Sequence, residues 1–145
     1  MTTTKALADD FSVCSFVTPA ELPVLAKTFR TLVNARPDAE EPGQPSSSEI
    51  EQAALQLGLE YVHIPVVPGQ IGDDQVAAFA RALSDRPSPV LAFCKSGGRA
   101  ASLWALSRPG EHGSEQVLAA AAKAGFDLQA LKPRLDARLD ACAPS

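Results

Sequence analysis

The stretch "PVLAFCKSGGRAASLWAL", Pro89–Leu106, decides the fold class. Its first five residues are a continuous apolar run, which is typical of a strand buried on both faces of a sheet. Cys94 follows, then two glycines and an arginine, and residues 100–106 are predicted to be helical. Ligands of open α/β sheets bind at the carboxyl ends of the strands. The sequence therefore predicts that Cys94 lies where such a sheet binds its ligand.

The rest of the chain alternates between strand and helix patterns. Periodicity and breaker residues predict strands over 11–16, 29–34 and 59–67, a loop over 35–47, and helices over 20–28, 116–124 and 128–139. Two further helices are predicted, one beginning at a Ser48–Glu51 capping box and one capped by Asp73 or Asp74. This alternation indicates a mostly parallel sheet with helices on both faces, and so an α/β protein.

The length and composition limit the classes of function. With 145 residues, 46% of them hydrophobic, the chain is expected to form one domain over 1–145 that includes the C-terminal helices at 115–140. A net charge of −4 argues against nucleic acid or an anionic membrane as partner. Three widely spaced cysteines, no apolar span and no leader pattern predict a cytoplasmic protein. No metal-ligand spacing or nucleotide motif indicates a cofactor.

The loop from Cys94 to Arg99, here termed the anion cradle, carries the chemistry. Gly97 and Gly98 tolerate positive φ, so the N–H groups from Lys95 to Arg99 can converge on one point beside the positive end of the next helix. These groups favour a thiolate at Cys94, to which Ser96 could add a hydrogen bond, and Arg99 offers a bidentate fork for an oxyanion. The plainer alternative is a buried free cysteine before a glycine turn, which is the interpretation kept for Cys14 and Cys142.

The motif "CKSGGR" resembles the active loop of the superfamily that joins tyrosine and dual-specificity phosphatases with rhodaneses. The wider pattern, "TLVNARPDAEEPGQPSSSEIEQAALQLGLEYVHIPVV" at 31–67 followed by "FCKSGGRAASLWAL", is similar to the phosphatase-like domain of beta-lactamase hydrolase-like proteins, which is often labelled a sulfurtransferase. The resemblance spans about residues 5–107. It implies a phosphatase-like fold, with a parallel sheet of four or five strands flanked by helices.

Two chemistries compete within this superfamily. Phosphatases carry His-Cys and five residues before the arginine, whereas here Phe93 precedes Cys94 and four residues separate it from Arg99, as in rhodaneses. Dual-specificity phosphatases also place an acidic Asp where this chain has Pro68, although Asp73 or Asp74 could serve from the same loop. The sequence therefore favours a sulfurtransferase that uses a Cys94 persulfide. The alternatives are a phosphatase that uses a Cys94 phosphocysteine and, less favoured, an arsenate reductase or a non-catalytic anion-binding module.

The expected partners follow from that choice. The first is a small sulfur-containing anion or a persulfide, or a phosphorylated substrate in the alternative case. The resemblance also implies a partner enzyme that processes persulfides. Arg36 and Asp38, with Glu40 and Glu41, lie in a loop that could approach Cys94, and a salt-linked loop is the simpler interpretation. His63 is expected to be structural.

Overall fold

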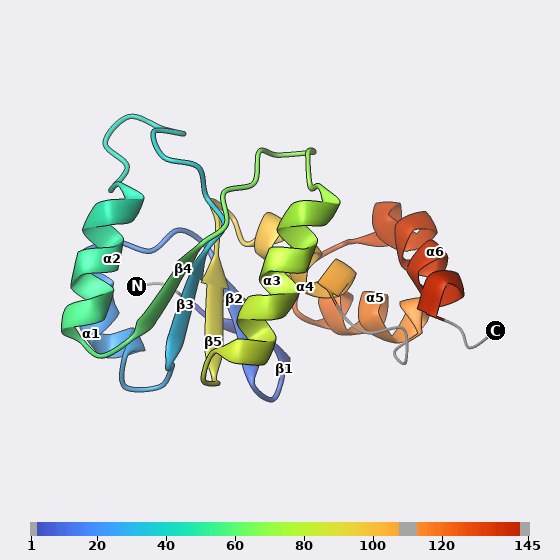
Figure 1. Cartoon of the computed structure of the whole chain (residues 1–145), viewed down its shortest axis with the longest axis horizontal. Coiled ribbons are helices and arrows are strands. Elements are labelled where there is room, and N and C mark those ends of the chain that lie inside the picture. Colours follow the sequence, from blue (N-terminus) through green and yellow to red (C-terminus); the bar gives the residue numbers. More distant parts are fainter. Residues whose placement is uncertain (1–2, 108–112, 143–145) are drawn as a thin grey trace.

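The computed structural model describes residues 3–107 and 113–142, and its centre is a five-stranded sheet in the order β1-β2-β5-β3-β4 (Figure 1). The strands are β1 (Lys5–Ala8), β2 (Phe11–Cys14), β3 (Thr31–Asn34), β4 (Glu60–His63) and β5 (Val90–Phe93). β1 runs antiparallel to β2, and the other pairs are parallel. The predicted mostly parallel sheet is therefore confirmed.

The central position of β5 follows from its composition. Its four residues are all buried, as expected for a strand covered on both faces. β2 pairs on one side and β3 on the other, so that Phe93 lies opposite Cys14 and Asn34. The carboxyl ends of three parallel strands therefore meet where β5 ends, and Cys94 is the next residue.

Helices cover both faces of the sheet (Figure 1). The short 3-10 turn Pro19–Glu21, α1 (Leu22–Leu25) and α2 (Ser47–Gln56) pack on one face, where Leu91 and Phe93 join their apolar cluster. On the other face lie α3 (Asp73–Asp85), α4 (Gly98–Ser107), α5 (Ser114–Lys123), the 3-10 turn Gln129–Leu131 and α6 (Lys132–Cys142). Alternate residues of β5 thus support opposite layers. No helix among the described residues is long and apolar enough to cross a membrane.

Two helix starts differ from those predicted. α2 is capped by Ser46, whose hydroxyl accepts the Glu49 N–H at 3.1 Å, rather than by Ser48. The reason is that the Ser47 N–H already donates to Asp38 at 2.7 Å, which places Ser47 in the first turn. α3 is capped by Gly72, and the predicted caps Asp73 and Asp74 occupy its first turn, where a carboxylate suits the helix dipole.

Some predicted elements were also longer than those observed. The helix expected over 20–28 is a 3-10 turn followed by four α-helical residues, and the strand expected over 59–67 spans only Glu60–His63. β1 was not predicted at all. It is a four-residue edge strand with two exposed positions, and it lacks the alternation that identifies a strand in a sequence.

Candidate active site

The anion cradle directly follows β5 and encloses the thiol of Cys94. Cys94 is fully buried, and the Gly97 N–H donates to its Sγ at 3.1 Å. Gly97 has φ +94°, and a Cβ there would lie 3.1 Å from the Phe126 ring and 3.3 Å from the Cys14 carbonyl oxygen. The backbone turn that brings this N–H to the thiol therefore requires glycine at position 97.

Gly98 and Ser96, which were also predicted to form the cradle, differ from the prediction. Gly98 does not have positive φ, contrary to the prediction, because it is already the first residue of α4. The Ser96 hydroxyl is exposed, and none of the hydrogen bonds found among residues 3–107 and 113–142 joins it to Cys94. The backbone N–H of Gly97 thus donates one hydrogen bond to the sulfur. The ten-residue α4 directs its positive end to the same loop.

Arg99 lies in the first turn of α4 with its guanidinium largely buried, 11% of the side chain being exposed. Its Nη1 and Nη2 donate to the two carboxylate oxygens of Glu40 at 2.7 and 2.9 Å. Nη1 also donates to the Val66 carbonyl oxygen at 2.8 Å. These bonds use three of the five guanidinium N–H groups, and Nε–H and one Nη2–H donate to neither Glu40 nor Val66.

The charge of Arg99 is favoured by its surroundings. The hydrogen bond to Glu40 raises the pKa of the Arg99 guanidinium, and the negative charge of a Cys94 thiolate acts in the same direction against the effect of burial. The charged form of the Arg99 guanidinium is therefore favoured both by its carboxylate partner and by the neighbouring sulfur. A pocket for an anion needs both groups in one place, and the fold brings them together from the two ends of one loop.

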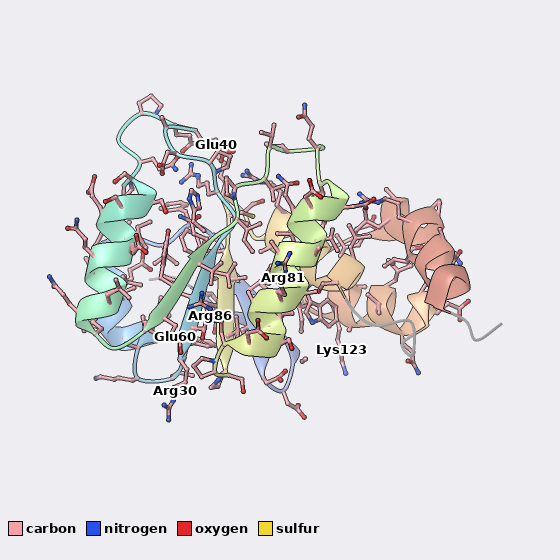
Figure 2. The ribbon with its side chains drawn as sticks, in the orientation of Figure 1. Arg30, Glu40, Glu60, Arg81, Arg86 and Lys123 are labelled. Carbon is pink, nitrogen blue, oxygen red and sulfur yellow. The ribbon has the colours of Figure 1, made fainter. Side chains whose placement is uncertain are left out.

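Glu40 lies between two guanidinium groups on the loop that follows β3, above the carboxyl edge of the sheet (Figure 2). Its Oε1 also accepts from Arg36 Nε at 3.0 Å, and Arg36 is 4% exposed. The hydrogen bond from Arg99, with a smaller contribution from Arg36, lowers the pKa of Glu40 to about 2. This permanent carboxylate fixes the orientation of Arg99.

Replacing Glu40 with glutamine is expected to lower the free energy of unfolding by about 2 kcal/mol at neutral pH, the usual effect of losing charge-assisted hydrogen bonds. The folded-state pKa of Glu40 lies below its ordinary value of 4.5, so the wild-type advantage should be complete above pH 4.5 and disappear as the pH falls towards 2. Urea unfolding of both proteins between pH 7 and 2 measures this. A difference that stays constant over that range would contradict it.

A second set of paired charges lies beside the cradle, and we term this region its mouth (residues Phe16, Arg36, Glu41 and Lys95). Lys95 forms an ion pair with Glu41, whose other oxygen lies 3.2 Å from Arg36 Nη2. The Arg36 guanidinium also lies 5.7 Å from the centre of the half-exposed Phe16 ring. The cations Lys95 and Arg36 beside the cradle therefore already have a carboxylate partner, and Arg36 also contacts an aromatic ring.

A buried hydrogen-bond network holds this loop in place. Asn34 Oδ1 accepts the Arg36 N–H at 2.8 Å, and Asn34 Nδ2 donates to the Tyr61 hydroxyl at 3.0 Å. The Tyr61 hydroxyl lies 2.6 Å from Ser47 Oγ, and Asp38 accepts the Ser47 N–H. The predicted salt-linked loop is thus confirmed, and the network partner Tyr61 was not predicted.

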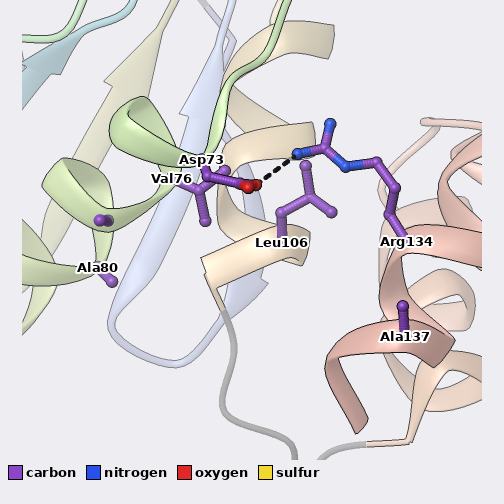
Figure 3. Close-up of a pocket in the computed structure, with 7 residues that line it drawn as sticks. Asp73, Val76, Ala80, Leu106, Arg134 and Ala137 are labelled. Atoms are coloured by element: carbon purple, nitrogen blue, oxygen red, sulfur yellow. Dashed lines mark hydrogen bonds and ion pairs between the residues drawn. The ribbon is translucent and has the colours of Figure 1, made fainter. Parts of the chain in front are cut away.

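The remaining predicted residues lie at the edge of the site or outside it. His63 Nε2 lies 2.9 Å from the Arg36 carbonyl oxygen, which fits its expected structural role. Asp73 lies 3.3 Å from Arg134 Nη2 of α6 and lines a cavity of about 500 Å³ with Val76 and Leu106 (Figure 3). Its carboxylate forms an exposed ion pair with α6, and Asp74 is exposed at the next position of α3.

Comparisons with known proteins relate the chain to a family of phosphatase-like domains. Residues 3–111 match the family described as beta-lactamase hydrolase-like protein, phosphatase-like domain. A beta-lactamase hydrolase-like protein of Xylella fastidiosa (strain Temecula1) is 40% identical over 102 residues, which are 69% of this chain and 24% of that protein. The aligned part is therefore about a quarter of the length of this curated relative.

Solved structures share the fold. A proposed phosphatase from Neisseria meningitidis Z2491 superposes with a TM-score of 0.81 at 29% identity, covering 92% of this chain and 96% of that chain. The core catalytic domain of a PP-IP phosphatase from S. cerevisiae gives a TM-score of 0.68 at 14% identity, covering 92% of this chain and 83% of that chain. The second likeness concerns the fold alone. The phosphatase-like fold expected from the sequence is thus confirmed.

Proposed function

The chain belongs to the family of phosphatase-like domains of beta-lactamase hydrolase-like proteins, and on that basis we propose that it is a cysteine-dependent phosphatase. One observation supports this most strongly. The sulfur of Cys94, the N–H of Gly97 and the guanidinium of Arg99 belong to one loop whose donors suit both a thiolate and an oxyanion. Sulfur transfer, the first choice from the sequence, becomes the second candidate because the structural relatives are phosphatases.

The proposed reaction has two steps. The Cys94 thiolate attacks phosphorus, an S–P bond forms, and the bond to the leaving oxygen breaks with its electron pair on that oxygen. Nε–H and the remaining Nη2–H of Arg99 bind the phosphoryl oxygens during transfer, while Glu40 keeps the guanidinium in place. Water then attacks the phosphocysteine, the S–P bond breaks, and the thiolate returns as dihydrogen phosphate leaves.

A specific observation supports sulfur transfer as the second candidate function. Only four residues separate Cys94 from Arg99, which is the loop length of rhodaneses, and Pro68 replaces the expected acid. In that reaction the Cys94 thiolate attacks the outer sulfur of thiosulfate, the S–S bond breaks, and sulfite leaves with the electron pair. The cysteine persulfide then passes its outer sulfur to an acceptor thiolate.

Trapping the covalent intermediate separates the two functions. We expect the purified chain, mixed with an activated aryl phosphate and quenched in acid within milliseconds, to carry a phosphoryl group on the peptide that contains Cys94. The same protein mixed with thiosulfate should carry no added sulfur, as judged by intact mass and peptide mapping. A persulfide without any phosphoryl adduct would reject the phosphatase proposal in favour of sulfur transfer.

A further inference from the structure

Among the described residues, the carboxyl groups that pair with the cations of the cradle are ionised and therefore do not donate a proton. A phosphatase acting on an ordinary ester needs a proton donor, because an alkoxide is a poor leaving group unless it is protonated. The resemblance to dual-specificity phosphatases places that acid just after the β4 segment. The nearby titratable side chains therefore decide which phosphoryl compounds the cradle can cleave.

The segment that should carry the acid lies against the cradle without one. Arg99 holds the carbonyl oxygen of the fully buried Val66 at 2.8 Å. The next two residues, Val67 and Pro68, are exposed and have no ionisable group. The position expected for the general acid is therefore occupied by valine and proline, neither of which can donate a proton.

The carboxylates of Glu40 and Glu41 already accept hydrogen bonds from, or form ion pairs with, the cations beside the cradle. Both oxygens of Glu40 accept from Arg99, and one of them also accepts from Arg36. Glu41 is paired with Lys95 and lies near Arg36. The ion pairs lower the pKa of both carboxyl groups, so that neither carries a proton at neutral pH.

The other candidate acids have different contacts or are exposed. Asp38 accepts the Ser47 N–H, and Asp73, whose side chain is fully exposed, lies 3.3 Å from Arg134 Nη2 of α6 (Figure 3). Asp74 is exposed, and at helical spacing it points away from the face of α3 that buries Val76. The ring of His63 is held against the carbonyl oxygen of Arg36.

From this arrangement, and resting on the proposed phosphatase function, we propose that the substrates are phosphoric anhydrides, whose leaving group departs as a stable anion without protonation. In the first step the electron pair of the broken P–O bond stays on a carboxylate or phosphate oxygen, and no proton is transferred. Phosphate esters of alcohols, such as phosphoserine or sugar phosphates, are excluded as good substrates because they would release an alkoxide.

Among phosphoric anhydrides, the charge of the mouth favours acyl phosphates as substrates. Three cations lie at or beside the cradle, and two carboxylates already pair with them (residues Arg36, Lys95, Arg99, Glu40 and Glu41). Such a mouth attracts a single phosphoryl group and offers little to a chain of further phosphates. An acyl phosphate carries its charge on the phosphoryl group alone, whereas a polyphosphate carries several more charges.

The test is the dependence of rate on the leaving group. For a series of aryl phosphates we expect kcat/KM to fall about tenfold or more for every two units by which the pKa of the phenol rises, as befits a reaction without a general acid. Acetyl phosphate should be cleaved at least about a hundredfold faster than glycerol phosphate, and faster than inorganic triphosphate. The Cys94→Ser protein provides the uncatalysed background.

Substitution at position 68 provides the matched comparison. Pro68→Asp supplies the missing acid and should flatten the dependence on phenol pKa, whereas Pro68→Asn, of the same shape without the proton, should leave it steep. A flat dependence in the unmodified protein would overturn the inference while leaving the phosphatase proposal intact. Absence of phosphate release from every compound, relative to Cys94→Ser, would instead reject the phosphatase proposal itself.

Discussion

Replacing Cys94 with serine is expected to lower kcat/KM for an activated aryl phosphate by at least about a thousandfold, equivalent to about 4 kcal/mol of transition-state stabilisation. The serine hydroxyl stays protonated at neutral pH, and the cradle has no general base among the described residues to activate it. Steady-state kinetics at matched protein concentration measures the loss. Activity within tenfold of the unmodified protein would rule out Cys94 as nucleophile.

Cys14 offers the matched control because it is also a buried cysteine at the end of a strand. It lies opposite Phe93 in the register between β2 and β5, and its side chain joins the apolar cluster on the α1 and α2 face. Burial, followed by the charges of Glu21 and Cys94, raises the pKa of Cys14 to about 12, so that it remains a thiol. Cys14→Ser should cost about 1 to 2 kcal/mol of stability and change kcat/KM less than threefold.

Replacing Arg99 with lysine should reduce kcat/KM by about a hundredfold to a thousandfold, since removal of one charge-stabilising donor commonly costs about 3 to 4 kcal/mol. Lysine keeps the charge, but it cannot hold Glu40 with two nitrogens, contact Val66 and still present two N–H groups to an oxyanion. The loss is expected mainly in kcat, because the contacts to the phosphoryl oxygens strengthen as charge develops.

Arg86→Lys is the control for that substitution. Arg86 and Glu60 form an exposed ion pair at 3.1 Å near the amino end of β4, far along the sheet from Glu40 (Figure 2). Exposed pairs contribute about 0 to 1 kcal/mol, so both stability and kcat/KM should remain near those of the unmodified protein. Equal effects of the two substitutions would show that the loss at Arg99 is unrelated to its place in the cradle.

The sequence was sufficient to predict the strand that ends just before Cys94, the helix that begins near Arg99, and the α/β class. These elements could be predicted because burial on both faces of β5 requires an uninterrupted apolar run, and because the turn at Gly97 requires a residue that tolerates positive φ. Both requirements act within a few neighbouring residues, so their signal is local.

Other features depend on contacts between distant segments. The partner of Arg99 is Glu40, which lies 59 positions earlier and belongs to a loop without regular structure. The start of α2 depends on the bond between Asp38 and the Ser47 N–H. Sequence spacing could bring Glu40 into the neighbourhood of Cys94, but it could not show that Glu40 orients the arginine.

The strand order also has a consequence for the way the chain folds. β2 and β3 each pair with β5 and not with one another, although β5 is the last strand in the sequence. During synthesis, the β1-β2 hairpin and the β3-β4 pair can form early, but the sheet closes only when β5 inserts between them. Cys94 reaches its buried position in that same step, so an incompletely folded chain contains no assembled cradle.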